Sequence, residues 1–233
     1  KTIGIDGTTL EANAALRTLV RRDDGQGYQE FLVELAKAEG IEEPTREDIA
    51  RIDRERPKKG SNEIWVKPHE PDAQISKMKA NATDMAHKVE HAVDMETGAV
   101  VAVTIHGGTT HDTKSIDATL EAAATNLGEV RETLEAERDD DDEPPSPIAG
   151  QIEEVVADKG YHSNETLCEL DESEIRPYIA EPKRGRRNWK NKETEKKLVY
   201  ANRRRTKGQR GRRLMRQRGE LLERPFAHAY ETG

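Results

Sequence analysis

Hydrophobic residues along the chain form short strand-like runs separated by longer stretches of helical spacing. Residues 2–6, 152–157 and 175–179 are brief runs rich in β-branched residues, a pattern typical of buried strands. Residues 87–105 hold two such runs on either side of a turn that contains Gly98, which predicts a β-hairpin. The pattern therefore predicts a sheet built from these strands.

Apolar residues at helical spacing predict helices between the strands. From Tyr28, apolar side chains recur at i, i+3, i+4, i+7 and i+8, and Pro44 opens a second helix-start signal. Asp112 is a suitable cap for a later helix with one apolar stripe. That stripe consists of Ile116, Leu120, Ala123, Ala124 and Leu127. The expected helical stretches lie at about 9–56, 114–137, 164–170 and 210–230.

The order of these elements predicts an α/β domain with a mixed sheet flanked by helices. An antiparallel hairpin comes first and a strand–helix–strand crossover follows, so both strand orientations meet in one sheet. Residues of about 10–86 are expected to be a largely helical insertion, irregular over 64–82. Residues 138–150 form an acidic linker, because a run of like charges followed by prolines cannot pack. Residues 183–218 are expected to form a basic loop before the last helix.

Composition narrows the class of protein. Apolar residues make up 33% of the chain and charged residues 36%, against about 25% charged in typical globular chains. No run approaches the roughly 18 apolar residues of a membrane span. The single cysteine, Cys168, excludes an internal disulfide framework, fits a cytoplasmic setting, and is interpreted as a small buried hydrophobe. Strand-like sequence starts directly after Lys1, so residues 1–233 are interpreted as a fragment that lacks its N-terminal region.

Charge is strongly segregated along the chain. Residues 183–218 hold 17 Lys and Arg against 2 acids, a net charge of +15, although the whole chain carries −8. Such a block indicates a polyanionic partner, and nucleic acid is the favoured one. Trp189, Tyr200 and Tyr178 add aromatic faces that can stack on unpaired bases. The alternative is a solvated basic loop that neutralises the acidic remainder.

Three carboxylates are candidates for metal chemistry. Asp6 and Asp158 each follow a predicted strand, and the ends of neighbouring strands in an α/β sheet line the usual ligand crevice. Glu223 lies on the predicted last helix. Such a set can hold two Mg²⁺ or Mn²⁺ ions for in-line phosphoryl transfer. Each Asp alone is weak support, because an acid after a strand is usually a turn or cap residue.

Several strings resemble the insertion-sequence DDE transposases of bacteria and archaea. They are residues 5–12, 87–103, 155–165 and 218–233. The most specific pieces are the Asp-Lys-Gly-Tyr string at 158–161 and the Glu-Arg-x-Phe string at 223–226. The resemblance implies an RNase H-like core in which Asp6, Asp158 and Glu223 are catalytic and hold two Mg²⁺ or Mn²⁺ ions. It implies DNA cleavage and strand transfer, DNA ends and target DNA as partners, a homo-oligomer on DNA, and a place near the nucleoid.

The basic segment and the residues beside the acids are expected to bind DNA. The expected contacts are Lys159, Arg184, Arg186, Arg187, Lys190, Arg203, Arg204, Arg205, Arg210, Arg212, Arg213 and Arg224. Lys159 and Arg224 can equally be ion-pair partners of their neighbours. His162, after the Asp-Lys-Gly-Tyr string, is either a DNA contact or a surface loop residue.

Several alternatives stay open at this point. Glu220 competes with Glu223, because residues three apart share a helix face. Asp94 precedes the hairpin turn and is interpreted as a turn residue. Pro225 is expected to kink or end the last helix, which would displace Glu223. A catalytically inactive DNA-binding relic is one competing hypothesis. A stand-alone structure- or RNA-directed nuclease with the same fold is another.

Overall fold

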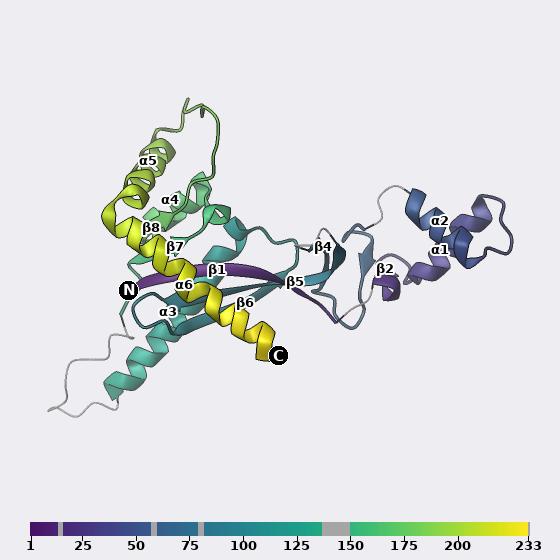
Figure 1. Ribbon diagram of the computed structural model, residues 1–233, viewed down its shortest axis with the longest axis horizontal. Helices are drawn as coiled ribbons and strands as arrows, with labels where there is room; N and C mark the ends of the chain where they lie inside the picture. The colour runs from purple at the N-terminus through teal and green to yellow at the C-terminus, as the bar shows by residue number, and fades with distance from the viewer. Residues whose placement is uncertain (14–15, 57–59, 79–81, 137–149, 233) are drawn as a thin grey trace. The chain divides into compact units, whose positions relative to one another are not determined.

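The computed structural model describes residues 1–13, 16–56, 60–78, 82–136 and 150–232, with side chains to Pro225 (Figure 1). The chain divides into two compact units. The sheet unit comprises residues 1–8, 89–105 and 110–233, and the inserted unit comprises 9–88 and 106–109. The acidic linker predicted at 138–150 lies outside the described residues except for Gly150.

In the described part of the chain, the main sheet has six strands, of which β4 (Gln74–Lys77) belongs to the inserted unit and the other five form the framework of the sheet unit. They are β1 (Thr2–Glu11), β5 (Thr83–Asp94), β6 (Val100–Gly107), β7 (Glu154–Ala157) and β8 (Arg176–Ile179). Their order across the sheet is β6-β5-β1-β7-β8. β1 and β7 are parallel, as are β7 and β8, whereas β5 and β6 form the predicted hairpin, with a bond from the Asp94 N–H to the Ala99 carbonyl. The prediction of a mixed α/β sheet is confirmed, and the order is consistent with an RNase H-like core.

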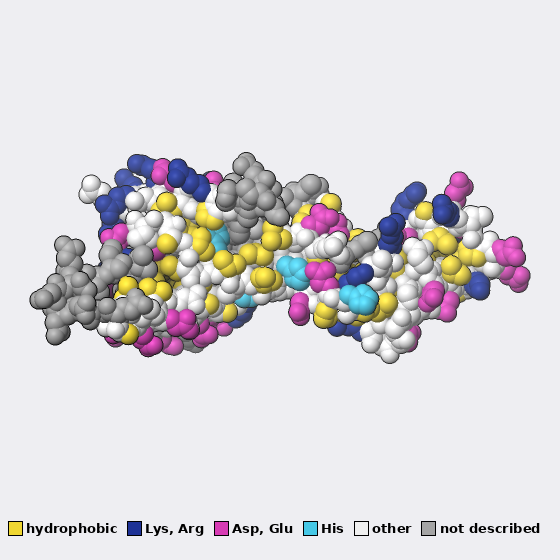
Figure 2. Space-filling model, turned by 90° about the horizontal axis from the view of Figure 1, so that it is seen from below, with side chains coloured by type: hydrophobic (Ala, Val, Ile, Leu, Met, Phe, Trp, Pro, Cys, Tyr) yellow, Lys and Arg dark blue, Asp and Glu magenta, His cyan; other side chains and the backbone are white. Residues whose placement is uncertain are grey.

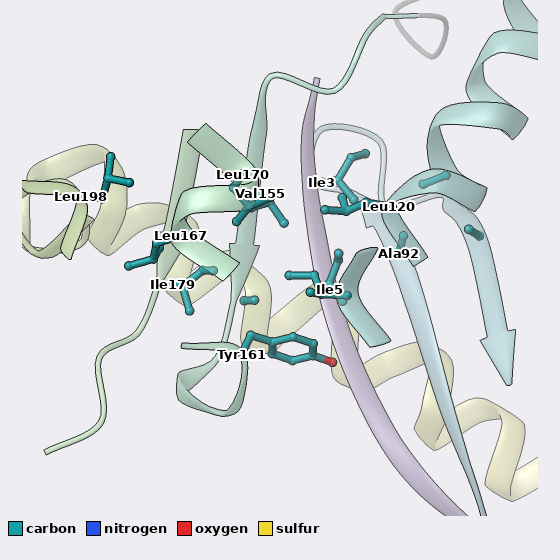
Figure 3. Packing of buried hydrophobic residues seen from close by; sticks show 14 of the residues in the cluster. Ile3, Ile5, Ala92, Leu120, Val155, Tyr161, Leu167, Leu170, Ile179 and Leu198 are labelled. Atoms are coloured by element: carbon teal, nitrogen blue, oxygen red, sulfur yellow. The ribbon is translucent and has the colours of Figure 1, made fainter. Parts of the chain in front are cut away.

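Helices cover both faces of this sheet. They are α3 (Asp112–Ala136), α4 (Asn164–Glu172), α5 (Glu193–Lys207) and α6 (Gln209–Thr232). Ile3 and Ile5 of β1 pack into the cluster formed with α3 and α4 (Figure 3). On the other face, Val156 of β7 packs with Leu214 and Leu222 of α6. Alternate residues of each strand therefore pack into two separate hydrophobic layers, one on each face of the sheet.

The apolar stripe of α3 explains why this segment is helical. Ile116, Leu120, Ala123 and Leu127 are all buried against the sheet, and full burial of a large aliphatic side chain stabilises the fold by about 1.5–3 kcal/mol. Ala124, which was expected in the same stripe, is exposed instead. It lies one residue beyond Ala123, and a step of about 100° turns its side chain toward solvent.

The inserted unit is only partly helical. Its helices are α1 (Tyr28–Ala38) and α2 (Arg46–Glu55), and its short strands are β2 (Val20–Arg21), β3 (Trp65–Val66) and β4 (Gln74–Lys77). The predicted start of α2 is confirmed, because the Thr45 hydroxyl accepts a bond from the Asp48 N–H at 3.2 Å. The expectation of helix from residue 9 is wrong, because β1 continues to Glu11. The expectation that 64–82 is irregular is wrong for two short strands. β3 pairs with β2, which is distant in sequence, and β4 pairs with the nearby start of β5.

The C-terminal part corrects two further expectations. Residues 183–218 are not one basic loop, because they include α5 and the first turns of α6. Asn202 of α5 is buried and pairs with both backbone groups of Ile179, which attaches α5 to the edge strand β8. Pro225 does not end α6, which continues to Thr232. No helix in the described part of the chain is both long and apolar enough to span a membrane.

Candidate active site

The register between β1 and β7 places Asp6 beside Asp158. Thr2 lies opposite Glu154 and Gly4 opposite Val156, a constant offset of 152 residues. Continuing this offset two residues beyond Gly4 and Val156 leads from Asp6 to Asp158, the residue directly after β7. Neighbouring residues of a strand point to opposite faces of the sheet, and the residues next to Asp6 and Asp158 belong to the core on the α3 face. Both acids therefore project on the face that α6 covers. Unlike the expectation, Asp6 lies within its strand rather than at its end.

The electrostatics of Asp6 show that the two acids are close. Burial raises the pKa of Asp6 above its ordinary value, and the negative charge of Asp158 raises it further. Arg218 of α6 opposes both effects, through an ion pair with the Asp6 carboxylate at 2.9 Å. The Gly7 N–H also donates to this carboxylate at 3.0 Å. Asp6 is thus a shielded carboxylate with one cation and one acid as neighbours.

Asp158 is held by the turn that follows it. Its carboxylate accepts a bond from the Gly160 N–H at 2.6 Å and caps the short 3₁₀ turn Lys159–Tyr161. Glycine suits this position, because a Cβ here would meet the carboxylate of Asp112 at the start of α3 and force that side chain to shift. The Asp-Lys-Gly-Tyr string therefore orients Asp158 and at the same time packs the turn against α3.

Glu223 and Glu220 are both exposed on α6. The helix is fixed by Leu222, whose side chain covers Gly4 of β1 so closely that a Cβ there would lie 2.7 Å from it. Glu223 is the next residue along α6, but its side chain faces solvent. Among the described residues, no three His, Cys, Asp or Glu side chains are gathered as a metal would require. The structure brings together Asp6 and Asp158 but does not bring Glu223 to them.

The pair of aspartates fits a divalent cation by its donor chemistry. Mg²⁺ and Mn²⁺ prefer hard oxygen ligands and need few from the protein, because Mg²⁺ keeps several waters. Two carboxylates in register on neighbouring strands supply such oxygens, and their mutual repulsion favours a cation between them. In this structure the positive charge beside Asp6 comes from Arg218.

The predicted DNA contacts fall into two groups. Nine are exposed, and they are Lys159, Arg184, Arg186, Lys190, Arg204, Arg210, Arg212, Arg213 and Arg224. Of these nine, Arg184 and Arg210 also bond to the protein, to the His162 carbonyl and to Glu154. The other three are partly buried: Arg187 and Arg203 both pair with Glu181, at 3.0 and 2.7 Å. The Arg205 Nε donates to the carbonyl of Pro177 at 3.1 Å. DNA contact by these three would compete with bonds inside the protein.

A basic hollow lies where α5 meets α6. It has a volume of about 700 Å³. Its lining consists of Lys207, Gln209, Arg210, Arg212, Arg213 and Arg216. Figure 2 shows Lys and Arg side chains gathered along one margin of the sheet unit and Asp and Glu along the opposite margin. The charge segregation seen along the chain is therefore also a segregation in space.

Three other residues singled out in the sequence have structural places. Asp94 is fully buried in the hairpin turn, where it accepts bonds from Lys1 at 3.0 Å and Thr97 at 2.9 Å. His162 is only 2% exposed, so its interpretation as a surface loop residue is wrong, and burial lowers its pKa. Cys168 is partly buried against the main core, and burial raises the pKa of its thiol.

Sequence reasoning missed Arg218 and Asp112 as neighbours of the acid pair. Arg218 was one of many cations in the basic segment, and only its position four residues before the buried Leu222 indicates that it faces the sheet. Asp112 was interpreted as a helix cap alone. Its approach to the Asp158 turn depends on how α3 packs, and no local pattern reveals that.

Comparison with protein-family models identifies the family of the chain. The family model described as "Transposase DDE domain" matches residues 5–229, a span that includes Asp6, Asp158 and both candidate glutamates. Comparisons with the curated proteins and with the solved structures found no match.

Proposed function

We propose a metal-dependent DNA-cleaving and strand-transferring function for this chain, which belongs to the transposase DDE domain family. The single observation that supports catalysis is the parallel pairing of β1 with β7, whose register, continued by two residues, leads to Asp6 and Asp158 on the face covered by α6. This arrangement supplies one oxygen donor from within β1 and one from the residue directly after β7, and a site next to strands is held more closely than one on loops.

Asp6, Asp158 and Glu223 would hold the two cations. Bound in pairs, such ions activate a water or a 3′-hydroxyl and stabilise the leaving oxygen of an in-line phosphoryl transfer. Asp158 is kept in place by its bond from the Gly160 N–H, and Asp6 by its bond from the Gly7 N–H. Glu223 is exposed on α6 and would have to move toward the pair when DNA binds.

The basic hollow between α5 and α6 is proposed to bind the phosphate backbone. Contact through Lys and Arg gives affinity without sequence choice, so recognition of the element ends requires other contacts. The proposed partners are the element ends, target DNA and a second copy of this chain on the same DNA. The proposed place of action is accordingly beside the nucleoid.

The test is Mn²⁺-dependent nicking of supercoiled plasmid by the parent chain and by Asp158→Asn. Asparagine keeps an oxygen that can accept the Gly160 N–H bond, so the turn is preserved while the charge is lost. Asp171→Asn, at an exposed position on α4, is the matched control. We expect nicking by the parent and the control but not by Asp158→Asn. Equal nicking by all three proteins would refute the assignment of Asp158.

The third acid is tested in the same assay by comparing Glu223→Gln with Glu220→Gln. Both residues are exposed on α6, so neither change disturbs the core. Loss of nicking in Glu223→Gln alone is expected, and the reverse result would transfer the role to Glu220.

An inactive DNA-binding relic is the second candidate function. It is favoured by one observation, that Glu223 is not gathered with the two aspartates among the described residues. A folded parent that binds DNA but does not nick it with any Mn²⁺ concentration would support this alternative.

A further inference from the structure

Glu90 of β5 is a carboxylic side chain enclosed in the core of the sheet unit. Its exposed fraction is 0%, and it lies on the face of the sheet opposite to Asp6. Three hydroxyl groups donate to it: Ser115 at 2.6 Å, Tyr161 at 2.8 Å, and Thr119. A buried acid of this kind is costly unless its oxygens are satisfied, so these bonds fix its place and those of its donors.

Tyr161 connects this buried acid to Asp158. It is 1% exposed and lies at the edge of the main core beside Ile5 (Figure 3). Burial and the neighbouring charge of Glu90 raise the pKa of Tyr161, so its hydroxyl stays protonated and remains a donor. Tyr161 ends the 3₁₀ turn that Asp158 caps. One three-residue turn therefore has Asp158 at its start and the bond to Glu90 at its end.

We propose that Glu90 and Tyr161 are positioning residues, and that their bond on the opposite face of the sheet holds the Asp158 carboxylate in place. The proposal rests on the function proposed above for Asp158. Without the Tyr161–Glu90 bond, the turn keeps its link to β7 and the packing of the Tyr161 ring, but loses its hydrogen bond to the core. The Asp158–Gly160 bond is then free to loosen, and a displacement of about 1 Å at a catalytic group can lower a rate about 100-fold.

The test compares Tyr161→Phe with Tyr178→Phe. Each change removes one buried tyrosine hydroxyl that donates to a buried glutamate, Glu90 in the first and Glu154 in the second, at 2.8 and 3.2 Å. Only Tyr161 lies in the Asp158 turn, whereas Tyr178 lies on β8 and bonds to Glu154 at the far end of β7. The control therefore reproduces the chemical change without the proposed positioning effect.

The first measurement is hydrogen exchange of the Gly160 amide, which reports the bond to Asp158 without requiring activity. We expect exchange of the Gly160 amide to accelerate about tenfold in Tyr161→Phe, because a tenfold change corresponds to the free energy of about one hydrogen bond. In Tyr178→Phe it should stay at the parent rate. The second measurement is nicking as a function of Mn²⁺ concentration. Tyr161→Phe should need several-fold more Mn²⁺ for half-maximal rate and bind DNA as tightly as the parent.

The outcomes separate this proposal from the proposed function. Unchanged Gly160 exchange in a folded Tyr161→Phe protein, or equal acceleration in both variants, overturns the positioning role. If the parent does not nick DNA, but Gly160 exchange accelerates in Tyr161→Phe and not in Tyr178→Phe, the link from Glu90 to Asp158 stands. That result refutes only the enzymatic function. If Tyr161→Phe does not fold, Glu90→Gln replaces it, since glutamine keeps the side-chain volume and one acceptor oxygen, and the same selective acceleration is expected.

Discussion

The attachment of α6 to the sheet depends on Glu154, a buried carboxylate at the start of β7. Its side chain is 6% exposed and forms an ion pair with Arg210 of α6. It also accepts bonds from Thr2 at 2.7 Å and from Tyr178 at 3.2 Å. Because α6 carries both Arg218 and Glu223, this anchor positions the helix that faces the acid pair. We predict that Glu154→Gln destabilises the sheet unit in a pH-dependent way.

The magnitude follows from the pKa of Glu154. Burial alone would raise it, but hydrogen bonds from Arg210 and Thr2 outweigh burial and lower the pKa from 4.5 to about 2. At about 1.36 kcal/mol per unit, this shift sets an upper limit of about 3 kcal/mol on the stabilisation by the charged form. Arg210 and Arg176 are 49% and 60% exposed, so solvent screening reduces the expected effect to about 1–2 kcal/mol.

The sign of the pH dependence is determined by the direction of the shift. A carboxylate whose pKa is lowered in the folded state stabilises the protein fully above its unfolded pKa, here 4.5. That stabilisation disappears as the pH falls toward about 2. Glutamine does not titrate, so the parent and Glu154→Gln should differ most in the free energy of unfolding near neutral pH. The difference should shrink steadily below a pH of about 4.5.

The assay is urea unfolding of the parent, Glu154→Gln and Glu153→Gln across this pH range. Glu153 is the neighbouring residue and is exposed, so its variant controls for the loss of one negative charge. A Glu154→Gln protein as stable as the Glu153→Gln control at neutral pH would refute the anchoring role. A difference that stays constant down to a pH of about 2 would refute the electrostatic origin.

Two further predictions concern the Asp158 turn and the basic hollow. Gly160→Ala should destabilise the protein by about 1–3 kcal/mol in thermal unfolding, because its Cβ meets the Asp112 carboxylate. Gly128→Ala on α3 is the control and should stabilise the protein by about 0.5–1 kcal/mol, since a Cβ there contacts nothing. The opposite order would contradict the packing described for the turn. Arg212→Ala should lower the salt dependence of DNA binding by about one counterion, measured by fluorescence anisotropy against Arg131→Ala on α3 as control. Equal salt dependence of DNA binding in the two variants would show that the DNA does not bind at the basic hollow.

Local patterns in the sequence were sufficient for several elements. The hairpin, the helix after Thr45 and the buried stripe of α3 were predicted because each depends on residues only a few positions apart. The charge of the basic segment was likewise visible, but its folded form was not. Its helix α5 is held by Asn202, which bonds to strand β8. The few buried residues of α5 stand among many cations, so no helical pattern of apolar residues was recognised.

The candidate site shows the same division. Asp6 and Asp158 were identified as candidates from their place after strand-like runs and from the resemblance to DDE transposases, and the family match covers both. The sequence by itself determined which residues carry the charges and hydroxyls, because residue type and local periodicity need no partner. Only the tertiary structure decided the register of β1 against β7, the pairing of Arg218 with Asp6 and the enclosure of Glu90. Each of these joins residues far apart in the chain, and their distances depend on how whole strands and helices pack rather than on any local preference.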